Sequence, residues 1–452
     1  MPLAAERTRR LAMQARRGAA TIAFVASLLF TASTAAVSEN NAPPLQPWID
    51  VAPTDGTLRI PPGTYSGPVL IDRPMTIDGN SKTILDGNGQ GTVLHLRTSG
   101  AVVRGLKIVR SGESHDRIDS GILVEGNNNR IEDNHIEDVL FGITLQRAND
   151  NIIATNRIRS KPWDIADRGD GLRLWYSTGN RIENNDIGQM RDVTISNSPH
   201  NRYIGNHIHG SRRAMNFLFS HRSLVEDNRL SHNATGLTIL NSDGIVIRRN
   251  HIAHAMDASG AGIALKESSA VLIHDNDILH CAVGILADSP MHAINRISII
   301  GNRLSHNVTG VSFYGERGGH LVYFNRFEHN LWQAVVGGEE RNDSNAWYGN
   351  YWDNYEGFDR DSNGIGDTPY EIRAYADRIW MDTPMARFFR NSPVLELLDF
   401  LERLAPFSTP TLVLRDSAPV LPTDGPQSQR VLPQRPTAGL LPATTTPQHR
   451  AD

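Results

Sequence analysis

The stretch NRIENNDI, residues 180–187, sets the pattern of the chain. Isoleucines alternate with polar residues, and Asn185 stands two residues before Ile187. Variants of this phrase return along the chain as NRIEDNHI, NIIATNRI, NRYIGNHI, SLVEDNRL, GIVIRRNHI, VLIHDNDI, RISIIGNRL and HLVYFNRF. Each variant carries the recurring asparagine, at intervals of 21 to 29 residues: Asn134, Asn156, Asn185, Asn206, Asn228, Asn250, Asn276, Asn302 and Asn325.

A unit of this kind consists of short two-periodic strands broken by Asn and Gly. It cannot bury its own apolar face, but stacking on copies of itself can bury it. A period near 22 fits one coil of a right-handed parallel β-helix, an all-β fold of the pectin-lyase-like kind. Stacked asparagines are expected to hydrogen-bond along the coil corners. A leucine-rich repeat has a similar period, but the LxxLxLxxN phrase is missing.

Eight residues after several of these asparagines, a glycine opens a second short strand: Gly142, Gly236, Gly284 and Gly310. The solenoid is predicted over residues 37–345, followed by a C-terminal module over 346–415 with a metal-type loop and an amphipathic helix. Residues 416–452 are rich in Pro, Thr and Gln and are predicted to be disordered. The chain has 452 residues, a formal net charge of −4 and a single cysteine, Cys281. It has no basic excess to suggest a nucleic-acid partner, and no intramolecular disulfide is possible.

The N-terminus has the order of a cleavable signal peptide. Five arginines between residues 7 and 17 precede the apolar run AATIAFVASLLFTASTAA, residues 19–36, which ends in small residues. Residues 1–36 are therefore predicted to direct export, with cleavage near Ala35 or Ala36. An uncleaved membrane anchor is the alternative, although the apolar core is short for a span.

Two loops are inserted before glycines that lie two coils apart. They are RSGESHDRIDSG, residues 110–121, and SKPWDIADRGDG, residues 160–171. Insertions on one face of a solenoid often form its binding surface. We expect both loops to leave the same corner and to offer a partner surface or, alternatively, solvated acidic loops. The side chains concerned are His115, Asp116, Asp119, Asp164, Asp167 and Asp170.

The seventeen histidines fall partly into register. Four residues after the repeat asparagine, five successive coils carry His232, His254, His280, His306 and His329. With strands about 4.8 Å apart, these residues are expected to form an imidazole column. Strand alternation predicts that the column shares the inward parity of the core and is structural. A second set, His135, His207 and His251, is predicted to point outward.

The stretch DRDSNGIGD, residues 359–367, alternates oxygen-bearing side chains around Gly364. This spacing matches the first part of an EF-hand-type loop, with no glutamate at the twelfth position and with Pro369 blocking a following helix. It predicts a Ca²⁺ loop outside any helix pair; an Asx-turn-rich loop without metal is the alternative. The predicted ligands are Asp359, Asp361, Asn363, the carbonyl of Ile365, and Asp367.

The run NAWYGNYWDNYEGFDRDSNGIGDTPYEI, residues 345–372, with YADRIW and SPVLELLDFLERLAPF after it, resembles the C-terminal signature of the NosD family. GDGLRLWYS, GIALKESS and GILADSPMH also resemble coils of that family, so the resemblance spans roughly residues 48–418. It implies a non-enzymatic periplasmic protein that works with an ABC transporter. It further implies a role in assembling the copper–sulfur centre of nitrous oxide reductase, with the reductase and a copper chaperone as further partners.

The resemblance also implies copper handling, with Met215, His207 and His209 as candidate ligands. Asn216, Leu218 and Leu240 stand where family members tend to have a histidine and two methionines. The segment SPVLELLDFLERLAPF, with Leu398 and Leu401 on its apolar stripe, is a candidate helix for docking on a membrane subunit or for capping the coils. The competing class is a carbohydrate-active β-helix, a lyase, epimerase or hydrolase. It would draw carboxylates from the insertion loops, with Lys161 or Arg168 nearby.

Overall fold

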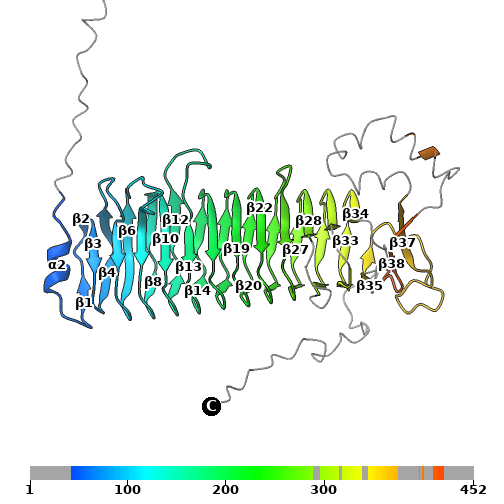
Figure 1. Cartoon of the computed structure of the whole chain (residues 1–452), viewed down its shortest axis with the longest axis horizontal. Helices are drawn as coiled ribbons and strands as arrows, with labels where there is room; N and C mark the ends of the chain where they lie inside the picture. Colours follow the sequence, from blue (N-terminus) through cyan, green and yellow to red (C-terminus); the bar gives the residue numbers. More distant parts are fainter. Residues whose placement is uncertain are drawn as a thin grey trace, which may run out of the picture. The chain divides into compact units, whose positions relative to one another are not determined.

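A computed structural model describes residues 42–288, 296–314, 318–337, 345–374 and 411–421, together with 397, 400 and 401. The described residues from Pro44 onward belong to one compact unit. It is built almost wholly of short strands that stack side by side along one axis (Figure 1). In the described part of the chain, no helix is long and apolar enough to span a bilayer.

Each coil contributes one strand to a twelve-stranded parallel sheet, sheet B. Its members are β3 (Val69–Ile71), β5 (Leu94–Leu96), β7 (Ser120–Val124), β10 (Phe141–Gln146), β13 (Leu172–Trp175), β16 (Asp192–Ser196), β19 (Arg213–Leu218), β22 (Thr235–Leu240), β25 (Ala261–Lys266), β28 (Val283–Asp288), β31 (Thr309–Tyr314) and β34 (Trp332–Gly337).

The other strands of each coil belong to sheet A, in two rows separated by a corner. The first row contains β1 (Thr57–Arg59), β8 (Arg130–Glu132), β11 (Ile152–Ala154), β14 (Arg181–Glu183), β17 (Arg202–Ile204), β20 (Leu224–Glu226), β23 (Val246–Arg248), β26 (Leu272–His274), β29 (Ser298–Ile300), β32 (Leu321–Tyr323) and β35 (Ala346–Tyr348). The second row contains β2 (Gly63–Ser66), β9 (His135–Val139), β12 (Arg157–Ser160), β15 (Asp186–Gly188), β18 (His207–His209), β21 (Arg229–Ser231), β24 (His251–Ala253), β27 (Asp277–Leu279), β30 (Arg303–Ser305), β33 (Arg326–Glu328) and β36 (Tyr351–Trp352). The longer β4 (Thr76–Asp86) and β6 (Val102–Val109) run through both rows.

Strands of successive coils pair in parallel and in register, so equivalent residues stack. Ile182, for example, lies opposite Tyr203, which lies opposite Val225, and all three side chains are buried. The apolar positions of the repeat phrase thus form one continuous core inside the coils. The predicted parallel β-helix is confirmed, with about twelve coils.

The repeat asparagines form the predicted ladder. In each step the backbone N–H and the Nδ2 of one asparagine donate to the Oδ1 of the next, as from Asn206 to Asn228 at 2.9 and 3.0 Å. The other Nδ2 hydrogen donates to a backbone carbonyl, for Asn206 that of Ile182. The amide oxygen and nitrogen of the ladder asparagine are thereby both hydrogen-bonded, which is the condition for burying an amide. The ladder runs through Asn134, Asn156, Asn185, Asn206, Asn228, Asn250, Asn276, Asn302, Asn325 and Asn350.

The glycines that open the sheet-B strands are needed for close approach between coils. A Cβ on Gly142 would lie 2.2 Å from the carbonyl oxygen of Gly171 and 2.4 Å from Cγ2 of Ile158. Gly236, Gly284 and Gly310 meet the next coil in the same way. A side chain at these positions would push coils apart, so the spacing of the stack itself requires glycine.

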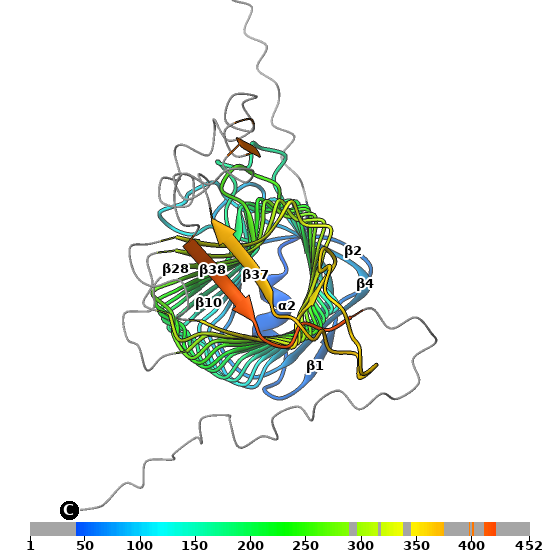
Figure 2. The same cartoon turned by 90° about the vertical axis from the view of Figure 1, so that its right-hand side faces the viewer.

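The two ends of the stack are closed by different elements (Figure 2). The short helix α2 (Gln46–Val51), which sequence analysis did not predict, buries Ile49 at the N-terminal end. At the other end β37 (Tyr370–Ala374) pairs antiparallel with β38 (Thr411–Asp416). The ring of Tyr370 stacks on Trp352 at 4.4 Å between centroids.

Both predicted boundaries at the C-terminal end are placed too early. Strands β35 and β36 continue sheet A in register beyond residue 345, because Asn350 still extends the ladder. Asp416, the first residue of the predicted disordered tail, is fully buried as the last residue of β38. The prediction of disorder rested on the average composition of residues 416–452. One buried aspartate does not change that average, so the composition could not indicate this contact. Residues 422–452 and the predicted signal peptide lie outside the described residues.

Candidate metal centre

Three metal-ligating side chains converge on the outer surface of sheet A. They are Asp186 on β15 and His207 and His209 on the neighbouring β18, and one ligand atom from each lies within 4.8 Å of the others. The Oδ1 of Asp186 is 3.5 Å from Nδ1 of His207 and 3.3 Å from Nε2 of His209. The two rings are 4.7 Å apart between centroids, and all three side chains are half-buried.

The register between coils creates this convergence. Asp186 lies opposite His207 and Gly188 lies opposite His209 in the parallel pairing of β15 with β18. Because Gly188 has no side chain, the ring of His209 leans over it; an added Cβ would lie 2.4 Å from Cε1 of His209. The glycine therefore lets both imidazoles reach the single carboxylate one coil below.

Arg159, on the preceding coil, completes the cluster. Its Nη2 donates to Oδ2 of Asp186 at 2.6 Å and lies 3.4 Å from Nε2 of His209. Burial would raise the pKa of Asp186, but the hydrogen bond and charge of Arg159, followed by His209 and His207, bring it below its ordinary value. Burial, and then the neighbouring His209, lower the pKa of His207. Near neutral pH this leaves an ionised carboxylate beside a neutral imidazole that has a free lone pair.

Two imidazoles and one carboxylate suit a borderline divalent ion such as Cu²⁺ or Zn²⁺. Met215, the soft ligand proposed from the sequence, is not part of this group. It lies on β19 in sheet B, is fully buried, and belongs to the core. The two imidazoles and the carboxylate therefore suit an ion that prefers imidazole ligands. The guanidinium group of Arg159 already pairs with the Asp186 carboxylate.

Sequence analysis named His207 and His209 and missed Asp186, Gly188 and Arg159. A signal for Asp186 was present, since it follows the repeat asparagine Asn185 directly, as His207 follows Asn206. Aligning the phrases by their asparagines stacks the two residues. The contributions of Gly188 and Arg159 depend on side-chain positions that the phrase does not specify.

The two insertion loops do meet, as predicted. The ring Nε2 of His115 is 3.0 Å from the backbone carbonyl oxygen of Asp167, and the His115 ring packs edge-on against Phe141. His115, Asp116, Asp164 and Asp167 are exposed. These four residues remain candidates for contact with a partner.

Asp119 and Asp170 do not reach that surface, because both are 1% exposed. Asp119 accepts a hydrogen bond from the backbone N–H of Ser114, and Asp170 lies 3.3 Å from Nη2 of Arg191. Burial raises the pKa of Asp170, although the charge of Arg191 opposes the shift. Both carboxylates form hydrogen bonds or ion pairs at the base of their loops. The prediction that they belong to the exposed partner surface is therefore wrong. A carbohydrate-active site could not draw on Asp170 as an open acid.

The five-histidine column exists, but it points outward. Neighbouring rings lie 4.5 to 5.2 Å apart between centroids, and all five residues are exposed. Each has a positive φ, between 52° and 60°. A left-handed residue interrupts the two-residue alternation of a strand, so parity counted from the core isoleucine fails at this corner.

In the 359–367 loop the carboxylates of Asp359 and Asp367 accept hydrogen bonds from backbone N–H groups of the same loop. Asp359 accepts hydrogen bonds from the N–H groups of Asn363 and Gly364, at 3.0 and 2.8 Å. The Oδ1 of Asn363 accepts one from Ile365, and Asp367 accepts one from Arg360. Within the described residues, Asp359, Asp361 and Asp367 do not converge as Asp186 and its two histidines do. The arrangement is that of consecutive Asx turns, and calcium binding by this loop stays a prediction.

We expect Asp361→Ala to lower the melting temperature of the mature chain in calcium but not in chelator. The reason is that a bound ion would tie the loop to the end of the coil stack. Differential scanning calorimetry in both conditions measures this difference. If mutant and parent melt alike in calcium and in chelator, the loop binds no stabilising ion.

In the predicted docking helix, Leu397, Phe400 and Leu401 are helical and exposed. Leu398 lies outside the described residues. The docking role of this segment stays a prediction.

Comparison with known proteins found a matching family model and similar relatives. A family model described as "Periplasmic copper-binding protein (NosD)" matches residues 155–357. The chain is 28% identical to the "Probable ABC transporter binding protein NosD" of Pseudomonas aeruginosa, over 88% of this chain and 94% of the relative. It is 25% identical to the protein of the same name from Stutzerimonas stutzeri, over 92% of this chain and 94% of the relative.

Among solved structures, the A-module of the mannuronan C-5 epimerase AlgE6 from Azotobacter vinelandii matches with a TM-score of 0.49 and 14% identity. That match covers 64% of this chain and 90% of the epimerase module. A PL6 alginate lyase matches with a TM-score of 0.44 and 12% identity, over 70% of this chain and 80% of the lyase.

The fold and the cluster define a parallel β-helix protein that carries a His–His–Asp group on the outer face of its coils. The match to a family model and the two relatives indicate the family within this class. The family model over residues 155–357 and the two relatives named NosD support assignment of the chain to the NosD family.

Proposed function

We propose that this chain is a periplasmic accessory protein that works with an ABC transporter in the maturation of nitrous oxide reductase. We further propose that it holds a copper ion, as cargo, at Asp186, His207 and His209. The observation that carries this proposal is the convergence of these three side chains in a chain whose family is described as copper-binding. The names of its two relatives support the transporter as partner. Residues 1–36 would direct export to the periplasm.

The residues around the cluster suit reversible holding. His207 and His209 would bind the ion, and Asp186 would supply a compensating negative charge. Arg159 would have to leave Asp186 as the ion arrives, and it would return when the ion leaves. Since a half-buried carboxylate without a cation is unfavourable, this exchange lowers the cost of release. A carrier needs such a site more than it needs tight, permanent coordination.

The first test is copper binding by the mature chain. We expect His209→Asn to weaken Cu²⁺ binding strongly, because it removes one of three ligands. Gly188→Ala should weaken it by roughly 10- to 100-fold, because the new methyl group displaces the His209 ring without removing a ligand. Competition with a copper chelator measures both effects.

His251→Asn is the matched control for these variants. His251 also pairs with a carboxylate across coils, at 3.1 Å from Asp277, but the second ion-pair partner of Asp277 is Arg303 and not an imidazole. In cells, copper in purified nitrous oxide reductase should fall with His209→Asn and not with His251→Asn. Normal copper loading in the His209→Asn strain would exclude the cluster from maturation.

The transporter contact is a separate prediction. If the 393–404 segment docks its apolar stripe on a membrane subunit, Leu401→Asp should abolish co-purification with the transporter while the solenoid keeps its melting temperature. Val51→Asp changes an equally apolar and more exposed residue in α2 at the other end of the stack, so it serves as control. Retained co-purification of the Leu401→Asp variant would rule out this segment as the docking site.

A further inference from the structure

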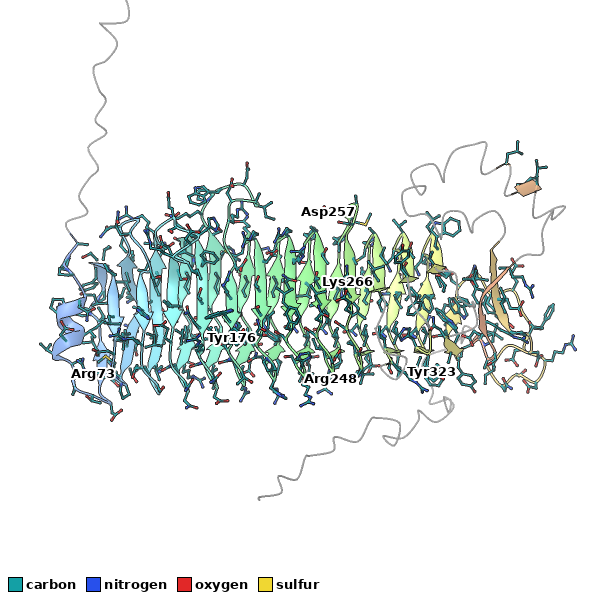
Figure 3. The ribbon with its side chains drawn as sticks, viewed as in Figure 1. Arg73, Tyr176, Arg248, Asp257, Lys266 and Tyr323 are labelled. Carbon is teal, nitrogen blue, oxygen red and sulfur yellow. The ribbon has the colours of Figure 1, made fainter. Side chains whose placement is uncertain are left out.

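The exposed histidine column is not used by the metal centre described above. It follows the second strand of sheet A on five successive coils, at His232, His254, His280, His306 and His329. Ring centroids are 4.5, 5.2, 5.1 and 4.9 Å apart in that order. The first three rings are close to parallel, with interplanar angles of 25° and 2°. His254 lies three residues before Asp257 on the same loop. Figure 3 labels Asp257 on the edge of the stack opposite Arg248 and Tyr323.

Backbone geometry alone does not account for this column. Histidine tolerates the left-handed region better than most residues, but Asn, Asp and Gly do so as well. The same coils have a second left-handed corner, between the two rows of sheet A, where φ lies between 53° and 66°. The five positions of that row hold four different residue types: Asp227, Arg249, Asp275, Gly301 and Phe324. A corner of this shape therefore accepts varied side chains, and five stacked imidazoles require another explanation.

The rings are available for ligands. In the described part of the chain, no hydrogen bond or ion pair reaches the ring nitrogens of His232, His254 or His280. His306 uses Nδ1 with the hydroxyl of Ser305 at 2.7 Å, and His329 lies 3.2 Å from Asp353, in each case leaving Nε2 free. Burial, and then the neighbouring His232 and His280, lower the pKa of His254. A lowered pKa favours the neutral form of the His254 ring, which is the form that binds metal ions.

We propose that this column is a second binding surface for imidazole-preferring transition-metal ions, in which each ion is shared by two neighbouring rings. Two nitrogens that bind one ion at about 2.0 Å each lie up to roughly 4 Å apart. The ring centroids lie 4.5 to 5.2 Å apart, so two neighbouring rings must turn out of their stacked orientation to aim both in-plane lone pairs at one ion. The column also adjoins the metal centre. Gly210, the residue after His209, donates its N–H to the carbonyl of His232 at 3.1 Å.

The surface goes beyond the proposed function, because it requires no partner and is measurable on the isolated mature chain. The test uses a His209→Asn background, so that the ions counted are not those of the Asp186 cluster. Two double variants remove the same number of histidines. His254→Asn with His306→Asn leaves three isolated rings, whereas His232→Asn with His329→Asn leaves His254, His280 and His306 contiguous. Asparagine suits the left-handed corner, so both variants should keep the parent melting temperature.

Binding of Cu²⁺ and of Zn²⁺ is then measured by calorimetry and by equilibrium dialysis. We expect the variant with isolated rings to bind roughly 10²-fold more weakly than the background, because a second tethered ligand raises the effective concentration. The variant with contiguous rings should keep the affinity and bind fewer ions. His200→Asn, an exposed left-handed histidine outside the column, should change neither value. Equal losses in the two double variants, or no loss in either, would overturn the shared-ion surface.

Discussion

Asp416→Ala should melt the C-terminal end of the solenoid well before the rest of the chain. The carboxylate stands at the end of the asparagine ladder, where the next asparagine would be. Its Oδ2 accepts hydrogen bonds from the backbone N–H and Nδ2 of Asn350 and from Nε1 of Trp352, at 2.9 to 3.1 Å. Its Oδ1 accepts from the N–H groups of Gly349 and Ala418.

Alanine would remove the acceptor of all of these donors, and only Nδ2 of Asn350 would keep another partner, the carbonyl oxygen of Val322. One unsatisfied buried donor costs about 1 to 3 kcal/mol, so the total loss should reach at least about 3 kcal/mol. Because each coil contacts mainly its neighbours, the loss should appear first as local opening near β36 and β38. Hydrogen exchange of the Gly349 and Asn350 amides measures that opening, together with the melting temperature.

Two further variants make this test specific. Asp416→Asn keeps one acceptor oxygen and should fall between the parent and Asp416→Ala. Ser417→Ala, at the exposed neighbouring residue, should behave like the parent. If Asp416→Ala leaves amide exchange at Gly349 and Asn350 unchanged, the ladder does not depend on this carboxylate.

Asn228→Leu should have a comparable effect in the middle of the stack. Asn228 accepts two hydrogen bonds from Asn206 and donates to Asn250 and to the backbone carbonyls of Tyr203 and Glu226. Leucine has the same branching at Cγ, with bulkier methyl groups in place of the oxygen and nitrogen, and it offers no polar atom. The N–H and Nδ2 of Asn206 and the carbonyl of Tyr203 would lose partners inside a low-dielectric core. We expect a loss of about 3 kcal/mol or more.

Urea unfolding measures this loss, with Arg229→Leu as control. Arg229 is the next residue on the same coil, but its side chain is exposed, so its replacement should change stability by less than about 0.5 kcal/mol. Equal stabilities of the two variants would mean that the ladder contributes little beyond the packing of its side chains.

The sequence by itself determined the coil. A phrase that alternates isoleucine with polar residues and repeats near every 22 residues can be satisfied only by stacking, and stacking in register forces the asparagines into a ladder. The positions of the ladder, of the core isoleucines and of the strand-opening glycines all follow from that single repeat. The meeting of the two insertion loops also follows, because both precede glycines that lie two coils apart.

Only the tertiary structure decided which way the side chains face and which distant residues they meet. A left-handed φ at each corner turned the histidine column outward, and no count along the chain reveals a backbone dihedral. Asp186 joins His207 and His209 because Gly188 opens room for a ring, and Asp119 and Asp170 are buried because arginines and loop amides enclose them. Asp416 completes the ladder from 66 residues beyond Asn350. A repeat phrase specifies neighbours at one period, and contacts formed outside that period depend on the folded chain.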